Sequence, residues 1–125
     1  MRLNYFMKKL YYLSTCDTCK KIINIWSPSD ELSLIDLKKN PINQKQLKEL
    51  YELSKSYESL FNKRALLYRE FKKKNPVPTE SDYKKLILEH YTFLKRPILL
   101  INDKLVIGNS KKSINEGFSE IEKLV

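Results

Sequence analysis

The stretch at residues 9–21 reads KLYYLSTCDTCKK and contains a predicted strand, the start of a predicted helix and two cysteines. Its first half, Lys9–Ser14, is rich in tyrosine and leucine and predicts a short β-strand. Within Thr18–Trp26, isoleucine and tryptophan side chains recur at a spacing that is typical of a helix packed on a sheet. A strand that leads directly into a helix places Cys16 at the N-terminus of that helix.

Cys16 and Cys19 are the two cysteines of the chain. At a helix N-terminus the unpaired backbone N–H groups stabilise a thiolate, so Cys16 is the predicted nucleophile. Cys19 lies one turn further along the same face, where it can attack an adduct on Cys16 and leave a redox-active disulfide. Thr18 and Lys20 are predicted to support the site, Lys20 because its charge adds positive potential.

Two other interpretations of this CxxC pattern stay open. A zinc half-site has the same spacing, but a tetrahedral site needs two more ligands, and the chain offers only His90 and no third cysteine. Two unreactive buried cysteines are the second interpretation, although a position between strand and helix argues against it. We therefore expect a thiol site that binds no metal and no resident cofactor.

The length of the chain and its N-terminal residues indicate an expected compartment and domain organisation. Residues 1–6 lack the apolar segment and the cleavage site of a secretory signal, and are expected to be an extension ahead of one domain, residues 7–125. Paired thiols without such a signal favour a reducing, cytoplasmic location. No run of about 18 apolar residues occurs, so we expect no membrane partner.

Further strand and helix signals follow along the chain. The predicted elements are a strand around residues 32–35, a helix over Gln44–Ser54 with Asn43 and Gln46 in a capping box, a helical segment over Tyr57–Phe71, a helix from Thr79 and Asp82 to about His90, strands over Ile98–Ile101 and Leu105–Ile107 in a hairpin, and a closing helix over Ser113–Leu124. The order β-α-β, helices, β-β-α is that of an α/β protein with a thioredoxin-like mixed sheet and a helical insertion at about residues 43–95.

The chain is strongly basic, with 24 Lys and Arg against 15 Asp and Glu and a net charge of +9. This charge favours either an anionic partner or, more simply, scattered lysines on solvated helix faces. Only two glycines occur, so glycine-rich phosphate-binding loops are excluded. We expect no direct DNA binding.

Two arginines are candidate anion-binding residues. Arg96 comes just before Pro97, and Pro97 begins an apolar strand, the position where a proline costs no ladder hydrogen bond. In thioredoxin-like folds a cis-proline at this place packs beside the thiols, and Arg96 would then direct its guanidinium into the same site, where it can hold an oxyanion. The simpler alternative for Arg96 is a surface arginine at a strand start. Arg64 is the second candidate, and by itself it would indicate little.

Together these segments resemble the arsenate reductase-like family, which groups the ArsC reductases with the Spx transcription regulators. The resemblance covers Met7 to about Leu124. It rests on Cys16 after the first strand, on Asn62 to Tyr68, on Leu94 to Leu99 and on Leu105 to Ser110.

The resemblance implies roles for single residues. Cys16 corresponds to the catalytic cysteine, Arg64 and Arg96 to two arginines that bind the oxyanion, and Pro97 to the cis-proline. Cys19 lies where the Spx proteins carry the second cysteine of their redox switch. The reductases have a further arginine within residues 104–109, and this chain has none there. The chain is thus most similar to the thiol-reductase and Spx-like branch.

Two functions follow from this resemblance. The first is a thiol-dependent reductase in which Cys16 attacks and Cys19 resolves, with glutathione as co-substrate or a glutaredoxin as electron donor. The second is an Spx-like regulator that binds RNA polymerase and uses the two thiols as a switch. Whether the protein is an enzyme, and which oxyanion or disulfide it would reduce, stays open at this point.

Overall fold

The computed structural model describes residues 8–124, and the predicted extension, residues 1–6, lies outside them. The chain forms two compact units. Of the described residues, the sheet unit contains 8–40 and 96–124, and the helical unit is Pro41–Lys95.

The sheet unit is built on one mixed sheet with the strand order β2-β1-β3-β4. Its strands are β1 (Lys8–Tyr12), β2 (Ser33–Asp36), β3 (Ile98–Ile101) and β4 (Lys104–Ile107). Strand β1 pairs in parallel with β2 and antiparallel with β3, and β3 pairs antiparallel with β4. The order of elements in this unit confirms the predicted β-α-β and β-β-α segments of a thioredoxin-like sheet.

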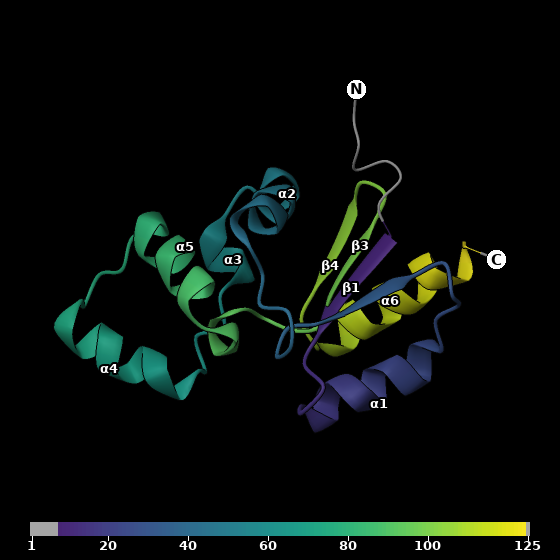
Figure 1. Ribbon diagram of the computed structural model, residues 1–125, viewed down its shortest axis with the longest axis horizontal. Coiled ribbons are helices and arrows are strands. Elements are labelled where there is room, and N and C mark those ends of the chain that lie inside the picture. Colours follow the sequence, from purple (N-terminus) through teal and green to yellow (C-terminus); the bar gives the residue numbers. More distant parts are fainter. Residues whose placement is uncertain (1–7, 125) are drawn as a thin grey trace. The chain divides into compact units, whose positions relative to one another are not determined.

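Helices α1 (Asp17–Trp26) and α6 (Lys111–Glu122) lie side by side in the sheet unit (Figure 1). Their apolar residues form one core with one face of the sheet. The buried members of this core are Leu10, Ile22, Trp26, Leu32, Leu99, Ile101, Val106 and Ile121. The two helices approach closely because Gly117 of α6 lies under the Trp26 ring, whose Nε1 donates a hydrogen bond to the Ile114 carbonyl at 2.9 Å.

The helical unit contains α2 (Gln44–Ser54), α3 (Tyr57–Leu60), α4 (Leu66–Lys74), α5 (Glu80–Glu89) and the 3₁₀ turn η2 (Tyr91–Phe93). Both predicted capping boxes are confirmed, Asn43 with Gln46 and Thr79 with Asp82. The centre of the unit is Phe61, whose ring contacts other aromatic rings. The ring centroids lie 4.9 Å away for Tyr68, 4.8 Å for Tyr83 and 5.4 Å for Phe93.

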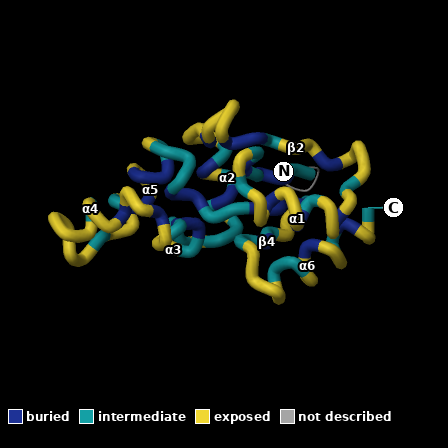
Figure 2. Tube along the Cα trace, turned by 90° about the horizontal axis from the view of Figure 1, so that it is seen from below, coloured by how far each residue is buried: buried dark blue, intermediate teal, exposed yellow. Residues whose placement is uncertain are grey.

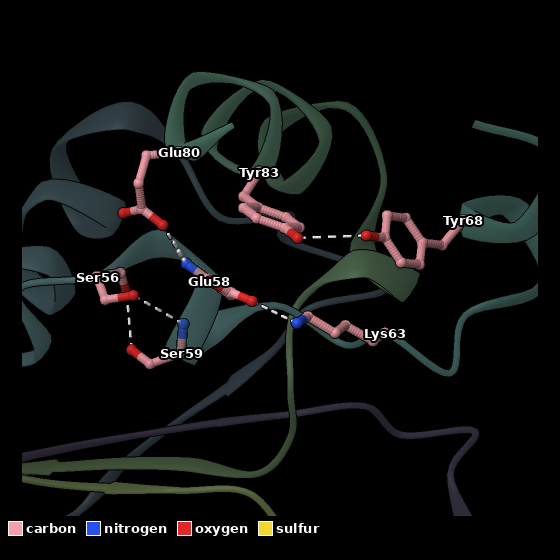
Figure 3. A network of polar contacts seen from close by, with 7 residues as sticks. All are labelled: Ser56, Glu58, Ser59, Lys63, Tyr68, Glu80 and Tyr83. Carbon is pink, nitrogen blue, oxygen red and sulfur yellow. Dashed lines mark hydrogen bonds and ion pairs between the residues drawn. The ribbon is translucent and has the colours of Figure 1, made fainter. Parts of the chain in front are cut away.

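Polar contacts connect the helices of this unit (Figure 3). The Glu80 carboxylate accepts the backbone N–H groups of Tyr57 at 2.7 Å and Glu58 at 2.9 Å, so the first residue of α5 caps the N-terminus of α3. The hydroxyl groups of Tyr68 and Tyr83 share a hydrogen bond of 3.3 Å, and Lys63 forms an ion pair with Glu58.

One helix prediction is wrong. The helical spacing over Tyr57–Phe71 does not produce one helix but α3 and α4, with an irregular segment between them. The Phe61 N–H still donates to the Glu58 carbonyl of α3 at 3.1 Å, but the Asn62 N–H donates to the Phe93 carbonyl at 2.7 Å and Phe61 forms a β-bridge with Leu94, so the helical bonding stops at Phe61. Leu66 and Leu67 of α4 are exposed, and most of this helix is exposed as well (Figure 2).

The other elements agree with the prediction to within two residues. The closing helix begins at Lys111 and not at Ser113, because Ser110 supplies the N-cap by accepting the Ser113 N–H at 3.0 Å. The β3–β4 hairpin turns at Asn102, which has a φ of 56°. No helix within residues 8–124 is long and apolar enough to cross a membrane.

Candidate thiol site

The turn between β1 and α1 positions Cys16. The Cys16 N–H donates to the Leu13 carbonyl at 3.0 Å and closes the turn, and the Lys20 N–H donates to the Cys16 carbonyl at 3.1 Å and begins the helix. Cys16 is the N-cap residue of α1 and has an extended backbone, but its side chain makes no capping hydrogen bond. The half-buried sulfur is therefore at the helix N-terminus, as the sequence predicts.

The surroundings of Cys16 favour its thiolate. Burial acts to raise the pKa of this thiol, but hydrogen bonds from the backbone N–H and the thiol of Cys19 act against it. The Arg96 guanidinium adds a further hydrogen bond and its positive charge. The combined result is a pKa of Cys16 below its ordinary value.

Cys19 has the opposite properties. Its side chain is completely buried, and this burial is the largest cause that raises the pKa of Cys19 to about 11. The neighbouring Cys16 raises this pKa further, because a second negative charge beside a thiolate is unfavourable. At neutral pH Cys19 is thus a protonated hydrogen-bond donor, and Cys16 is the group that ionises.

Arg96 reaches this site from the start of β3. The Arg96–Pro97 peptide bond is cis, and Pro97 is buried directly before Ile98. The Pro97 carbonyl accepts the Gly108 N–H at 2.9 Å, where Gly108 has a φ of +86°. This contact ties the end of β4 to the residue that follows Arg96, so both ends of the hairpin are fixed beside the arginine.

The structure brings together three of the predicted site residues, Cys16, Cys19 and Arg96. Thr18 and Lys20 are exposed residues in the first turns of α1. Arg64 belongs to the helical unit, where its backbone N–H donates to Asn62 Oδ1 at 3.1 Å, and its convergence with Cys16 stays a prediction. Within residues 8–124 no group of three or more His, Cys, Asp or Glu side chains could hold a metal ion.

Asp36 also contacts the thiol turn, a role that the sequence did not indicate. This buried carboxylate at the end of β2 accepts the Ser14 N–H at 3.1 Å, two residues before Cys16. The available signal was an acidic residue at the end of an apolar strand that is expected to lie beside the first one. Such a residue also occurs in ordinary turns, so the sequence alone did not distinguish the two roles.

The comparisons with known proteins agree with this fold. An arsenate reductase from Vibrio cholerae superposes with a TM-score of 0.70 at 16% identity, covering 88% of this chain and 98% of that chain. An arsenate reductase-related protein from Brucella melitensis superposes with a TM-score of 0.64 at 23% identity, covering 88% of this chain and 92% of that chain.

A third structure, an ArsC family related protein from Bacteroides fragilis, has a TM-score of 0.70 at 20% identity and covers 89% of this chain and 98% of that chain. At these identities the structures show the fold alone. No curated protein matches the chain. The model of the ArsC family matches residues 11–117, which include Cys16, Cys19, Arg64 and Arg96. Because this match extends over most of the sequence, the chain belongs to the ArsC family.

Proposed function

We propose that the protein is a thiol-dependent reductase in which Cys16 is the nucleophile and Cys19 the resolving thiol. The observation that carries this proposal is the difference between the two thiols. Cys16 is partly accessible and its pKa is lowered, whereas Cys19 is completely buried and its pKa is raised to about 11. Substrate therefore meets Cys16 first, and Cys19 reacts only with what is bound to Cys16.

The first step transfers substrate to Cys16. With a disulfide substrate, the Cys16 thiolate attacks one sulfur, forms a mixed disulfide and releases the other sulfur as a thiolate, which takes up a proton. With an oxyanion such as arsenate, the thiolate displaces one oxygen as water, with protons from solvent, and forms a thiol–arsenate adduct. In this second case Arg96 would bind the anion, and its contact with the Cys16 sulfur supports this role.

The second step uses a change in the pKa of Cys19. While Cys16 is a thiolate, its charge and its hydrogen bond both raise the pKa of Cys19. Formation of the adduct removes this charge, so Cys19 loses its proton more easily once substrate is attached. The Cys19 thiolate then attacks the Cys16 sulfur, forms the Cys16–Cys19 disulfide and releases the reduced product with the electron pair. Two molecules of glutathione, or the dithiol of a glutaredoxin, would return the pair to the reduced state.

A turnover assay tests this proposal. The reduced protein is given either bis(2-hydroxyethyl) disulfide with glutathione, or arsenate with glutathione and glutaredoxin. In both arms NADPH consumption through glutathione reductase is measured. We expect turnover above the background without the protein in at least one arm, and its loss in Cys16→Ser. If the wild type does not exceed Cys16→Ser in either arm, the reductase proposal is wrong.

Cys19→Ser provides the matched control. With this variant the first step should proceed and the second should not, so mass spectrometry is expected to find the mixed disulfide on Cys16. The Spx-like alternative would be favoured by another result, obtained with the wild type. A wild type that forms the Cys16–Cys19 disulfide with peroxide, but turns over no substrate, would have the properties of a redox switch and not of a reductase.

A further inference from the structure

The Asp36 carboxylate is a charged group in the core of the sheet unit. Its residue is only 7% exposed, and it pairs with Tyr12 at the carboxyl ends of β2 and β1. One carboxylate oxygen, Oδ1, accepts two backbone N–H groups, from Ser14 and from Lys38, both at 3.1 Å. A buried carboxylate is costly unless such bonds compensate the loss of water.

These bonds connect Asp36 to the thiol turn. Ser14 is the second residue of the turn that the bond from Cys16 N–H to the Leu13 carbonyl closes. The residue directly before the turn is also held, because the N–H of Leu37, which follows β2, donates to the Tyr12 carbonyl at 2.8 Å. Residues on both sides of the turn are therefore fixed by backbone bonds, and its interior is fixed by Asp36.

We propose that Asp36 is a positioning residue for Cys16, which holds the Ser14–Thr15 turn through the Ser14 N–H and so keeps the sulfur at the N-terminus of α1. This role deepens the proposed function and rests on it, since Cys16 is the nucleophile in that scheme. The effect on Cys16 passes through the backbone, because the carboxylate contacts Ser14 and not the sulfur.

The ionisation of Asp36 is consistent with this role. Burial acts to raise the pKa of Asp36, but hydrogen bonds from Ser14 and Lys38 and the charge of Lys39 outweigh it, and the pKa lies below its ordinary value. Asp36 is thus a carboxylate at neutral pH. The groups that act on the Cys16 sulfur are Cys19 and Arg96, so a direct charge effect and a positioning effect of Asp36 can be separated by experiment.

The experiment measures the rate of iodoacetamide alkylation of Cys16 against pH in the wild type, Asp36→Ala and Asp36→Asn. A positioning role predicts that Asp36→Ala raises the midpoint of this profile, because the turn is released and Cys16 moves away from its donors. A shift of one pH unit would make alkylation about tenfold slower below the midpoint. Asp36→Asn keeps an oxygen that accepts the Ser14 N–H, and should leave the midpoint unchanged or slightly lower.

The sign of the shift distinguishes the alternatives. A direct charge effect would lower the midpoint in both variants, because both remove a negative charge. A purely structural role would lower the free energy of unfolding and leave the midpoint unchanged. Either result overturns the proposal. Asp30→Ala, the same substitution at an exposed position of the sheet unit, is the control and should leave the profile unchanged.

A second measurement does not depend on the folding of a variant. Amide hydrogen exchange in the wild type should show the Ser14 N–H protected, as a bond to a buried carboxylate requires. Exchange of this amide at the rate of an open amide would refute the proposal, even if Asp36→Ala does not fold. Because alkylation and exchange need no turnover, a protein that reduces no substrate can still show that Asp36 positions Cys16, and the two proposals can fail separately.

Discussion

Asp36 in the sheet unit and Glu80 in the helical unit make similar bonds in different surroundings. Each carboxylate accepts two backbone N–H groups, Asp36 from Ser14 and Lys38 and Glu80 from Tyr57 and Glu58. Asp36 is buried, whereas Glu80 is exposed. The bonds of Glu80 are shorter, but water can replace them when the side chain is removed.

This difference in burial indicates different roles for the polar contacts of the two units. In the helical unit they close exposed helix ends, where the loss of one bond costs about 1 kcal/mol. In the sheet unit a polar contact holds a turn that carries a reactive sulfur, and its removal would leave a half-buried N–H without its acceptor. Position of the thiol, more than stability, is what we expect the buried carboxylate to control.

The cores of the two units also differ, in the kind of side chain that fills them. Aliphatic side chains and Trp26 fill the core between α1, α6 and the sheet, whereas aromatic rings around Phe61 fill the helical unit. Substitutions in each core can test how far this comparison holds.

The largest effect is expected for Phe61→Ala in the helical unit. Phe61 is 0% exposed and contacts three aromatic rings, so its removal should lower the free energy of unfolding by about 3–5 kcal/mol. Urea denaturation followed by circular dichroism measures this change. Phe118→Ala is the matched control, because Phe118 of α6 is 40% exposed and should cost much less. Equal losses for the two variants would contradict this account of the helical core.

In the sheet unit, Gly117→Ala is expected to have the next largest effect. A Cβ atom at this position would lie 2.2 Å from Cζ2 of Trp26, an indole that is held by its bond to the Ile114 carbonyl. The clash should outweigh the better helix propensity of alanine and lower the free energy of unfolding by about 1–3 kcal/mol. Trp26 is the single tryptophan, so its fluorescence reports this unfolding directly. A gain in stability would show that the indole can move aside, and Ser119→Ala on the same helix serves as the control.

The sequence predicted the features that depend on neighbouring residues. The two capping boxes, the hairpin at Asn102 and the position of Cys16 at a helix N-terminus all arise from signals within a few residues, and the structure contains each of them. Pro97 before an apolar strand was also a local signal.

The features that the sequence did not predict depend on distant residues. The helical spacing over Tyr57–Phe71 was correct as a pattern, but the bond from Asn62 to Phe93, thirty-one residues away, divides the segment into α3 and α4. The contact between Asp36 and Ser14 likewise exists only because β2 pairs with β1. Such pairings follow from the assembled fold and not from local composition.

Removal of the Glu80 carboxylate should have a smaller effect than either core substitution. Glu80→Ala leaves the N–H groups of Tyr57 and Glu58 to water, and we expect a loss of about 1 kcal/mol in the free energy of unfolding. Glu80→Gln keeps one acceptor oxygen and should lose less. Thermal or urea denaturation of the three proteins gives this order. A loss from Glu80→Ala as large as that from Phe61→Ala would mean that exposure does not decide the strength of these contacts.

The smallest effect is expected at Cys19, and it concerns reactivity and not stability. Three hydrogen-bond donors lower the pKa of Cys16: the backbone N–H of Cys19, the Cys19 thiol and the Arg96 guanidinium. Cys19→Ala removes only the thiol donor, so the midpoint of Cys16 alkylation should move to higher pH, because a thiolate with fewer hydrogen bonds holds its proton more strongly. Cys19→Ser keeps a hydroxyl donor and should shift the midpoint less. Iodoacetamide rates between pH 5 and pH 10, with the product identified by mass spectrometry, measure both shifts. If the midpoint falls in Cys19→Ala, this prediction is wrong, and Cys19 acts on Cys16 mainly through its burial and not as a donor. In that case the Cys16 thiol would be the donor in the hydrogen bond between the two sulfurs.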